Sequence, residues 1–148
     1  MNQPNETACH RDRLYARNAD ERARIISGLT DELAHHGEVV FAFLYGSFAD
    51  SETFHDVDVG VYLDGRSPEH ASVSAVRLAQ RLSDRIGLPT DVRVLNDAPI
   101  SFLYHVLRGR LILNRDEDVL TEVMEATVHR YLDRAALLRH STKEAFAA

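Results

Sequence analysis

Apolar residues recur along the chain with two different periods, which predict an alternation of helices and strands. Between Asp20 and Gly37 they lie three or four residues apart, as in an amphipathic helix that Asp20 can cap and Gly37 ends. The next segment, Glu38–Tyr45, is almost continuously apolar and predicts a mostly buried strand. Gly46 and Ser47 break this strand.

The clearest strand signal is a strict alternation over Asp56–Leu63. Four apolar residues at every second position would face a core, and they are Val57, Val59, Val61 and Leu63. After the turn, Ser67 and Pro68 form a typical helix start, with serine as the N-cap and proline at the first helical position. This helix is expected to stop at Gly87, and a third strand is expected at Thr90–Leu95.

The last third of the chain predicts a short helix, a strand and a long helix. The short helix opens at Asn96–Pro99 and ends near Gly109, a strand follows at Arg110–Asn114, and an amphipathic helix starts near Asp116. This order of elements predicts one α/β or α+β domain. Residues 1–18 have no apolar period and are expected to be a flexible tail before a domain at 19–148.

Composition narrows the picture further. The chain has 148 residues, 45% hydrophobic and 27% charged, which is ordinary for a globular domain. It has no apolar run near the roughly 20 residues that span a bilayer, no secretory leader pattern and a single cysteine, Cys9, so no membrane association is expected and the cytoplasm is the default compartment. The net charge of −6 disfavours direct nucleic-acid binding.

Two acidic residues on the second strand are candidates for chemistry. Because strand side chains alternate, Asp56 and Asp58 would point to the same face, about 7 Å apart along the backbone. Two carboxylates so placed repel each other, and a hard divalent cation such as Mg²⁺ relieves the repulsion. The alternative is a solvent-facing strand that carries two acidic residues without function.

The Gly46-Ser47 break is a second candidate. Glycine lets a ligand approach the backbone closely. If Ser47–Asp50 begins a helical turn, its free N–H groups and the Ser47 hydroxyl could hold phosphate oxygens. A plain turn is the alternative reading of this dipeptide.

Together the two features resemble the nucleotidyltransferase superfamily, whose motif is an apolar strand, Gly-Ser, a spacer of about ten residues and Asp-h-Asp-h, where h is apolar. The matching segments are Phe43–Ala49 and Phe54–Tyr62. The resemblance implies a small mixed sheet flanked by helices and a third carboxylate on a neighbouring strand, where Asp91 falls. It assigns metal binding and catalysis to Asp56, Asp58 and Asp91, and nucleotide binding to Gly46 and Ser47.

The chain length and two later segments, Asp91–Pro99 and Val106–Ile112, look like those of minimal nucleotidyltransferase (MNT) proteins, over about Leu29 to Leu138. Members of that group commonly act as antitoxins beside a HEPN-domain ribonuclease toxin, in some cases by transferring AMP from ATP to a toxin tyrosine. The resemblance therefore implies Mg²⁺, ATP as substrate and a HEPN toxin as protein partner.

Two positions depart from the family pattern, and two alternative functions stay open. Asp50 stands where the family often has a basic residue, and His55 stands where it often has serine. A weakly active or inactive antitoxin that neutralises the toxin by direct binding is the first alternative, and nucleotidylation of a small molecule is the second. Arg93 could neutralise phosphate or pair with Asp91, and His35-His36 fits a helix end better than a metal site.

Overall fold

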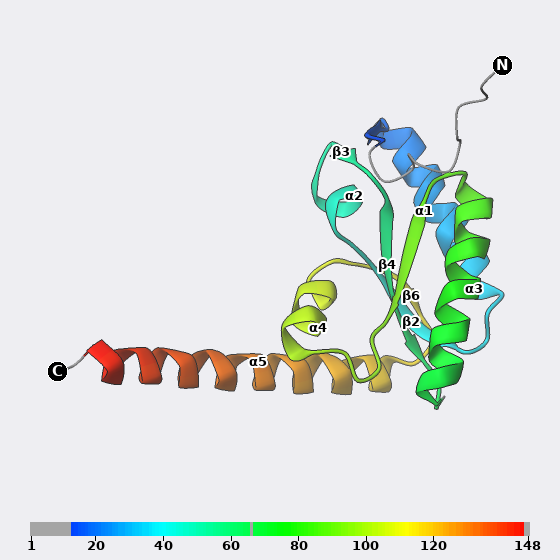
Figure 1. The fold of residues 1–148 in the computed structure, drawn as a ribbon. Coiled ribbons are helices and arrows are strands. Elements are labelled where there is room, and N and C mark those ends of the chain that lie inside the picture. Colours follow the sequence, from blue (N-terminus) through cyan, green and yellow to red (C-terminus); the bar gives the residue numbers. More distant parts are fainter. Residues whose placement is uncertain (1–12, 66, 147–148) are drawn as a thin grey trace, which may run out of the picture.

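The computed structural model describes residues 13–65 and 67–146 and is built around one four-stranded sheet (Figure 1). The strands are β2 (Val39–Tyr45), β4 (Val57–Leu63), β5 (Thr90–Val94) and β6 (Arg110–Asn114). Their order across the sheet is β5-β4-β2-β6, with β5 parallel to β4 and both neighbours of β2 antiparallel to it. The sheet is therefore mixed, and the predicted α/β single-domain class is confirmed.

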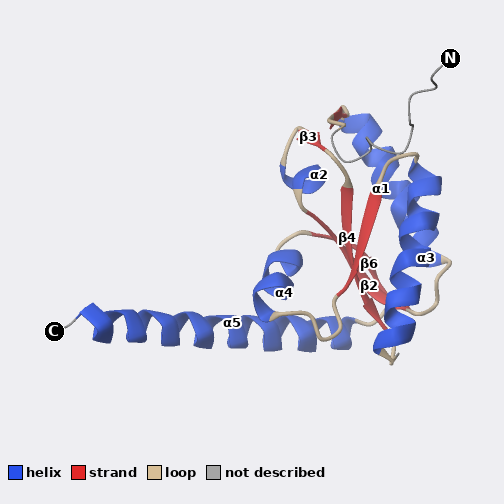
Figure 2. Cartoon of the chain, viewed as in Figure 1, coloured by secondary structure: helices blue, strands red, loops and turns tan. Residues whose placement is uncertain are grey.

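Helices cover both faces of the sheet (Figure 2). The two long helices on one face are α1 (Ala19–Ala34) and α3 (Pro68–Ile86), and the other face carries α4 (Ile100–Leu107) and the start of α5 (Glu117–Phe146). Leu29 and Leu82 are completely buried in the first core, whereas Phe41 and Val106 are completely buried in the second. The sheet is thus fixed from both sides.

Strand β4 has the alternation that the sequence predicts. Val57, Val59, Val61 and Leu63 all belong to the core under α1 and α3. Gly60 lies on the opposite face, where an added Cβ would come within 2.7 Å of the Val106 side chain, so α4 packs directly against this face of the strand. Asp58, two residues earlier on the same face, is half-buried.

The helix boundaries agree with the predicted capping signals at α3 but not at α1, which ends at Ala34 with His35 as its C-cap, before the predicted stop at Gly37. Ser67 caps α3, Pro68 is its first residue, and Gly87 ends it with a positive φ of 68°. The predicted cap Asp20 is wrong, because Asn18 caps α1. Its side-chain Oδ1 accepts from the Glu21 N–H at 2.9 Å, while Glu21 Oε2 accepts from the Asn18 N–H at 2.8 Å. This reciprocal pair is a capping box and satisfies two free donors at once.

Part of the segment predicted to be a flexible tail forms a strand. Residues 1–12, including Cys9, lie outside the described residues, but β1 (Tyr15–Ala16) pairs antiparallel with β3 (Thr53–Phe54). The Tyr15 ring stacks on Phe54 with 5.8 Å between centroids. The buried Phe54 anchors this short ribbon, and a pair of two-residue strands has no period to read from sequence.

The loop that follows β2 is held by an arginine on α1. Arg22 donates to the carbonyl oxygens of Ser51 and Glu52, both at 2.7 Å, and to that of Phe48. Its guanidinium also lies 4.9 Å from the centre of the Phe48 ring. Arg22 therefore fixes the path of the chain through α2 (Ser47–Asp50) toward β4.

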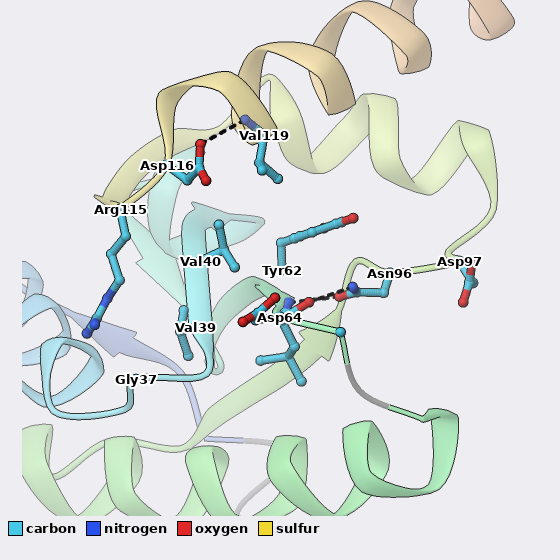
Figure 3. A pocket seen from close by; sticks show the side chains of 12 residues that line it. Gly37, Val39, Val40, Tyr62, Asp64, Asn96, Asp97, Arg115, Asp116 and Val119 are labelled. Atoms are coloured by element: carbon cyan, nitrogen blue, oxygen red, sulfur yellow. Dashed lines mark hydrogen bonds between the residues drawn. The ribbon is translucent and has the colours of Figure 1, made fainter.

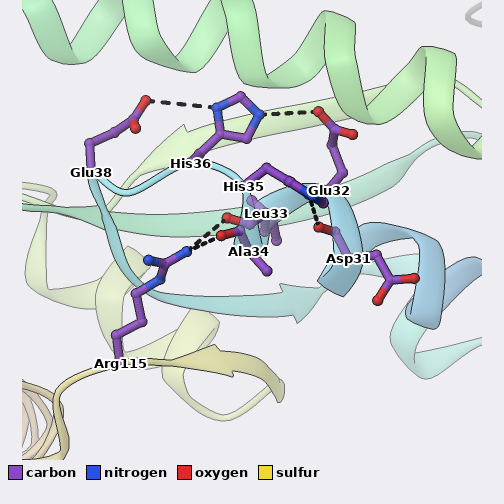
Figure 4. A network of polar contacts seen from close by, with 8 residues as sticks. All are labelled: Asp31, Glu32, Leu33, Ala34, His35, His36, Glu38 and Arg115. Atoms are coloured by element: carbon purple, nitrogen blue, oxygen red, sulfur yellow. Dashed lines mark hydrogen bonds and ion pairs between the residues drawn. The ribbon is translucent and has the colours of Figure 1, made fainter.

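A second arginine, Arg115, joins the end of α1 to the segment between β6 and α5 (Figure 4). Arg115, just before α5, donates to the carbonyl oxygens of Ala34 and Leu33, the latter at 3.5 Å, and so covers the free carbonyls at the end of α1. His36 lies between Glu32 (3.2 Å) and Glu38 (3.9 Å). These contacts are those of a helix end.

The last helix, α5, is longer than the rest of the domain requires. Its first half packs on α4, where the Tyr104 and Tyr131 rings stack with 3.7 Å between centroids. The second half extends past the other elements (Figures 1 and 2). Despite its 30 residues, neither α5 nor another helix within 13–65 and 67–146 combines the length and apolarity of a membrane span.

We expect Arg22→Met to lower the free energy of unfolding by roughly 2 kcal/mol, because three carbonyl groups lose a charged donor. Urea unfolding followed by circular dichroism measures the change. Arg24→Met is the matched control, since exposed Arg24 makes one bond of 3.4 Å to the Asp20 carbonyl oxygen on its own helix. Equal stabilities of the two variants would show that Arg22 does not hold the loop.

Candidate active site

Two of the three candidate carboxylates face each other across neighbouring strands. In the parallel ladder of β4 and β5, Asp58 pairs with Asp91, so both side chains leave the sheet on the same face. On the other side of β4, Asp58 pairs with Tyr45, the last residue of β2. The site therefore lies at one end of the strands, where β2 ends and where β4 and β5 begin. We call this end of the sheet the carboxylate edge.

The sequence predicts Asp56 as the first residue of the strand. In the structure it lies one residue before β4. The ladder begins at Val57, whose N–H donates to the Pro89 carbonyl oxygen at 2.9 Å. Asp56 is in the bend that precedes it and is half-buried. It remains close enough to contribute to the electrostatic environment of Asp58 and Tyr45.

The electrostatics of Asp58 are those of a crowded, partly buried carboxylate. Burial, followed by the charges of Asp56 and Asp91, raises the pKa of Asp58 from its usual value near 3.8 to about 6, and Arg93 opposes this increase. The same three carboxylates, together with burial as the largest cause, raise the pKa of the Tyr45 hydroxyl. An excess of negative charge at this edge of the sheet attracts a cation.

Arg93 already forms an ion pair with Asp91. Its Nε donates to Asp91 Oδ2 at 3.1 Å, and this bond is the largest cause of the raised pKa of Arg93. Both side chains are substantially exposed. Of the two alternatives that the sequence left open, the structure has the ion pair with Asp91.

Gly46 provides room for the Asp58 carboxylate. Its φ of 76° and ψ of −161° lie in a region that only glycine occupies readily. An added Cβ would collide with Asp58 Oδ2 and lie 3.2 Å from Asp58 Cγ. The group that approaches Gly46 is thus the Asp58 carboxylate, and the approach of a ligand to this glycine stays a prediction.

The segment after Gly46 does begin a helical turn, α2, with Ser47 as its first residue. Ser47 is half-buried beside Gly46, and Asp50 is exposed at the other end of the turn. His55 is also exposed, and its Nδ1 lies 3.1 Å from the Arg13 carbonyl oxygen. This contact joins His55 to the segment before α1.

Sequence reasoning missed Tyr45, which belongs to this site through its ladder pairing with Asp58. It is 8% exposed, and it meets Phe102 and His105 edge-on at centroid distances of 5.7 and 5.9 Å. The only sequence signal was its position directly before Gly46, which any strand-ending aromatic residue would share. Tyr45, His105, Arg108, Gly109 and Asp50 line a hollow of about 250 Å³.

A larger hollow, of about 500 Å³, lies at the opposite edge of the sheet (Figure 3). It is lined by the start of β2 and the end of β4, where Asn96 holds the backbone of Leu63 through two hydrogen bonds of 2.8 Å. Asp58 and Asp91 are not among its lining residues. They do not line the smaller hollow either, but Tyr45 does, and Tyr45 is the ladder partner of Asp58. We therefore place the chemistry beside the smaller hollow.

The donor set at the carboxylate edge suits a magnesium ion. Across residues 13–65 and 67–146, no three His, Cys, Asp or Glu side chains are arranged as a complete metal cage. Magnesium does not require one, because it is usually held by one or two carboxylates together with substrate phosphates and water. Asp58, half-buried against Gly46 with two further carboxylates nearby, fits such an ion.

A protein-family model for polymerase beta-type nucleotidyltransferases matches residues 28–118. This match covers more than half of the chain and includes the Gly-Ser turn and all three carboxylates. The chain belongs to the polymerase beta nucleotidyltransferase family. A search of curated proteins found no match.

Solved structures share the fold at low sequence identity. A toxin–antitoxin complex of MntA and HepT contains a chain that matches with a TM-score of 0.57 and 17% identity, over 88% of this chain and 100% of that one. A toxin–antitoxin with AMP-PNP matches with 0.54 and 18%, over 82% and 98%. A tri-AMPylated Shewanella oneidensis HEPN toxin in complex with MNT antitoxin matches with 0.52 and 17%, over 82% and 96%. These likenesses confirm the nucleotidyltransferase fold.

We expect Asp58→Asn to stabilise the metal-free protein at pH 7.5 and to have little effect at pH 3.5. The pKa of Asp58 is raised on folding, so its ionisation opposes folding; this penalty is absent below about pH 3.8, grows through the interval up to about 6 and is complete above it. Melting temperatures in EDTA across this range measure the effect. An Asp58→Asn variant that is less stable than the parent at pH 7.5 would contradict it.

We expect Gly46→Ala to lower the free energy of unfolding by roughly 1–3 kcal/mol, because alanine cannot adopt the Gly46 backbone conformation without strain. The added methyl group also displaces the Asp58 carboxylate. Gly37→Ala is the control, because nothing lies within 4 Å of a Cβ there. Chemical denaturation of both variants measures the difference, and a Gly46→Ala protein as stable as Gly37→Ala would rule out the close approach.

Proposed function

We propose that this protein is a Mg²⁺-dependent nucleotidyltransferase that transfers AMP from ATP to a tyrosine hydroxyl of a HEPN ribonuclease toxin, and that it acts as the antitoxin of that toxin. The observation that carries the proposal is the register pairing of Asp58 with Asp91, with Asp56 in the adjoining bend and Gly46 against the Asp58 carboxylate. Membership of the nucleotidyltransferase family supports the reaction class. The toxin–antitoxin complexes of the same fold support the choice of acceptor.

The proposed reaction is an in-line displacement at the α-phosphorus of ATP. The acceptor oxygen forms the new bond to phosphorus, the bond to the β-phosphate oxygen breaks, and pyrophosphate leaves with that electron pair. When bound, Mg²⁺ would neutralise charge that develops on the phosphate oxygens and orient the attacking and leaving groups.

The chain's own residues would do the rest. Asp56 and Asp58 would hold the metal, and Asp91 would share in metal binding or take the proton from the acceptor hydroxyl. Gly46 and Ser47 would bind phosphate oxygens next to them. Because such catalysis consists of positioning and charge neutralisation, loss of either metal carboxylate is expected to remove nearly all activity.

The charge of the chain suits a toxin that handles RNA. A ribonuclease needs a basic surface to meet phosphates, and this protein has a net charge of −6. Opposite charges favour fast and oriented association. The same argument holds for neutralisation by contact alone.

Direct neutralisation without catalysis is the second candidate function, and one observation favours it. Asp50 adds a further negative charge to the hollow beside Tyr45, in the same short turn as Ser47, which would bind phosphate. A fold with weakened nucleotide binding could still cover a toxin surface. The two candidates differ in whether the carboxylates are needed.

We expect label from α-³²P-ATP to appear on the HEPN protein of the same locus when this protein and Mg²⁺ are present. Asp56→Ala and Asp58→Ala should each reduce the labelling rate by at least about 100-fold, since each removes a metal ligand. Glu52→Ala, an exposed carboxylate in the preceding loop, is the control and should keep the parental rate. Phosphorimaging of the gel-separated partner gives the rate.

A parallel ribonuclease assay separates the two candidates. Toxin activity that returns with Asp56→Ala and Asp58→Ala supports AMP transfer. Neutralisation that survives both substitutions, without label on the partner, would replace the enzyme with the binding antitoxin.

A further inference from the structure

The hollow beside Tyr45 has one cationic group that no carboxylate neutralises. It is lined by Tyr45, Asp50, His105, Arg108 and Gly109. Arg108 is exposed at the end of α4 and has no acidic side chain within 4.0 Å among the described residues. Arg93, which lies beside the carboxylates, is paired with Asp91 at 3.1 Å. The positive charge available to a ligand in this hollow is therefore that of Arg108.

Aromatic packing holds Arg108 near the hollow. Its guanidinium carbon lies 5.6 Å from the centre of the Tyr104 ring, and Tyr104 stacks face to face on Tyr131 of α5. Stacking on an aromatic ring restricts a guanidinium while leaving its N–H groups able to donate. This arrangement reduces the entropy that Arg108 loses when it binds an anion.

The hollow also adjoins the reacting centre. Tyr45 lines it and is the ladder partner of Asp58, so the hollow is connected to the carboxylates through Tyr45. Asp50, which also lines the hollow, would repel an anion there unless a cation offset its charge. An arginine fork is the side chain best suited to do so, because it binds phosphate oxygens through two parallel hydrogen bonds.

We propose that Arg108, with His105 beside it, binds the β- and γ-phosphates of the nucleoside triphosphate in this hollow and so holds the pyrophosphate leaving group. The proposal rests on the proposed nucleotidyl transfer and deepens it. The role of Arg108 is to bind and position the triphosphate. Nothing in the sequence indicated this role, because Arg108 is 50 residues away from Asp58. Arg110, two residues later, also has the same charge.

The test compares ATP with AMP, which lacks the two phosphates in question. Isothermal calorimetry with Mg²⁺ should show that Arg108→Ala weakens ATP binding by about 10- to 100-fold, the range for losing a charged hydrogen-bonding pair. AMP affinity, measured by competition against a fluorescent nucleotide, should change by less than about twofold. Arg108→Lys should recover part of the loss, because it restores the charge without the fork.

Two further variants sharpen the result. Arg110→Ala is the control, since Arg110 is exposed on β6 and does not line the hollow; it should bind ATP as the parent does. Asp50→Asn should tighten ATP binding severalfold, because it removes the repelling charge while keeping the shape. Equal melting temperatures of the variants establish that the folded state is intact.

The outcomes are distinguishable. Unchanged ATP affinity in Arg108→Ala would overturn this inference and leave the proposed function standing. An equal loss for AMP and ATP would also overturn it, because the arginine would then act elsewhere on the nucleotide. A parent protein that binds neither ligand with Mg²⁺ would overturn the inference together with the proposed function.

Discussion

The parallel pairing of β5 with β4 is the constraint on which the site depends. It places Asp58 opposite Asp91 on one face of the sheet, although two neighbouring carboxylates repel each other. The opposite face explains why the pairing persists. Val57, Val59 and Val92 are buried there, and a register shift of one residue would bring each of them into the position of a carboxylate. The apolar core therefore fixes the register, and the carboxylates are held in a repulsive arrangement that a cation relieves.

The end of β2 serves the same arrangement from the other side. Tyr45 is held by aromatic contacts with α4, and the chain then turns at Gly46, whose missing side chain leaves room for Asp58. Arg22 of α1 holds the loop that follows, far along the chain from the residues that it serves. The carboxylate edge thus depends on a strand end that α4 holds, a turn that gives room to Asp58 and a loop that α1 holds.

The sequence predicted what has a repeating pattern and missed what depends on single long-range contacts. The structure confirms three such predictions: the alternation around Val57 and Val59, the cap at Ser67 and the helix end at Gly87. The β1–β3 ribbon and the clamp at Arg22 were missed, because one aromatic contact and three carbonyl bonds leave no period in the sequence. For the site, the spacing identified Asp56 and Asp58 as candidates from local geometry, whereas placing Asp91 relied on family resemblance. The partners of Tyr45, namely Phe102 and His105, follow only from how α4 packs.

Under the proposed function, the charge distribution around the site would couple metal binding to nucleotide binding. Asp50, Asp56, Asp58 and Asp91 all lie at or near one edge of the sheet, and the cation of Arg93 is already paired. A free triphosphate that approached this edge would meet net repulsion at short range, where screening by salt is weakest. A divalent cation reverses the sign of that interaction, and a bound triphosphate in turn supplies the oxygen ligands that the carboxylates alone do not complete. Each ligand would therefore raise the affinity of the other by the same factor, so metal and nucleotide would bind to this edge as one unit.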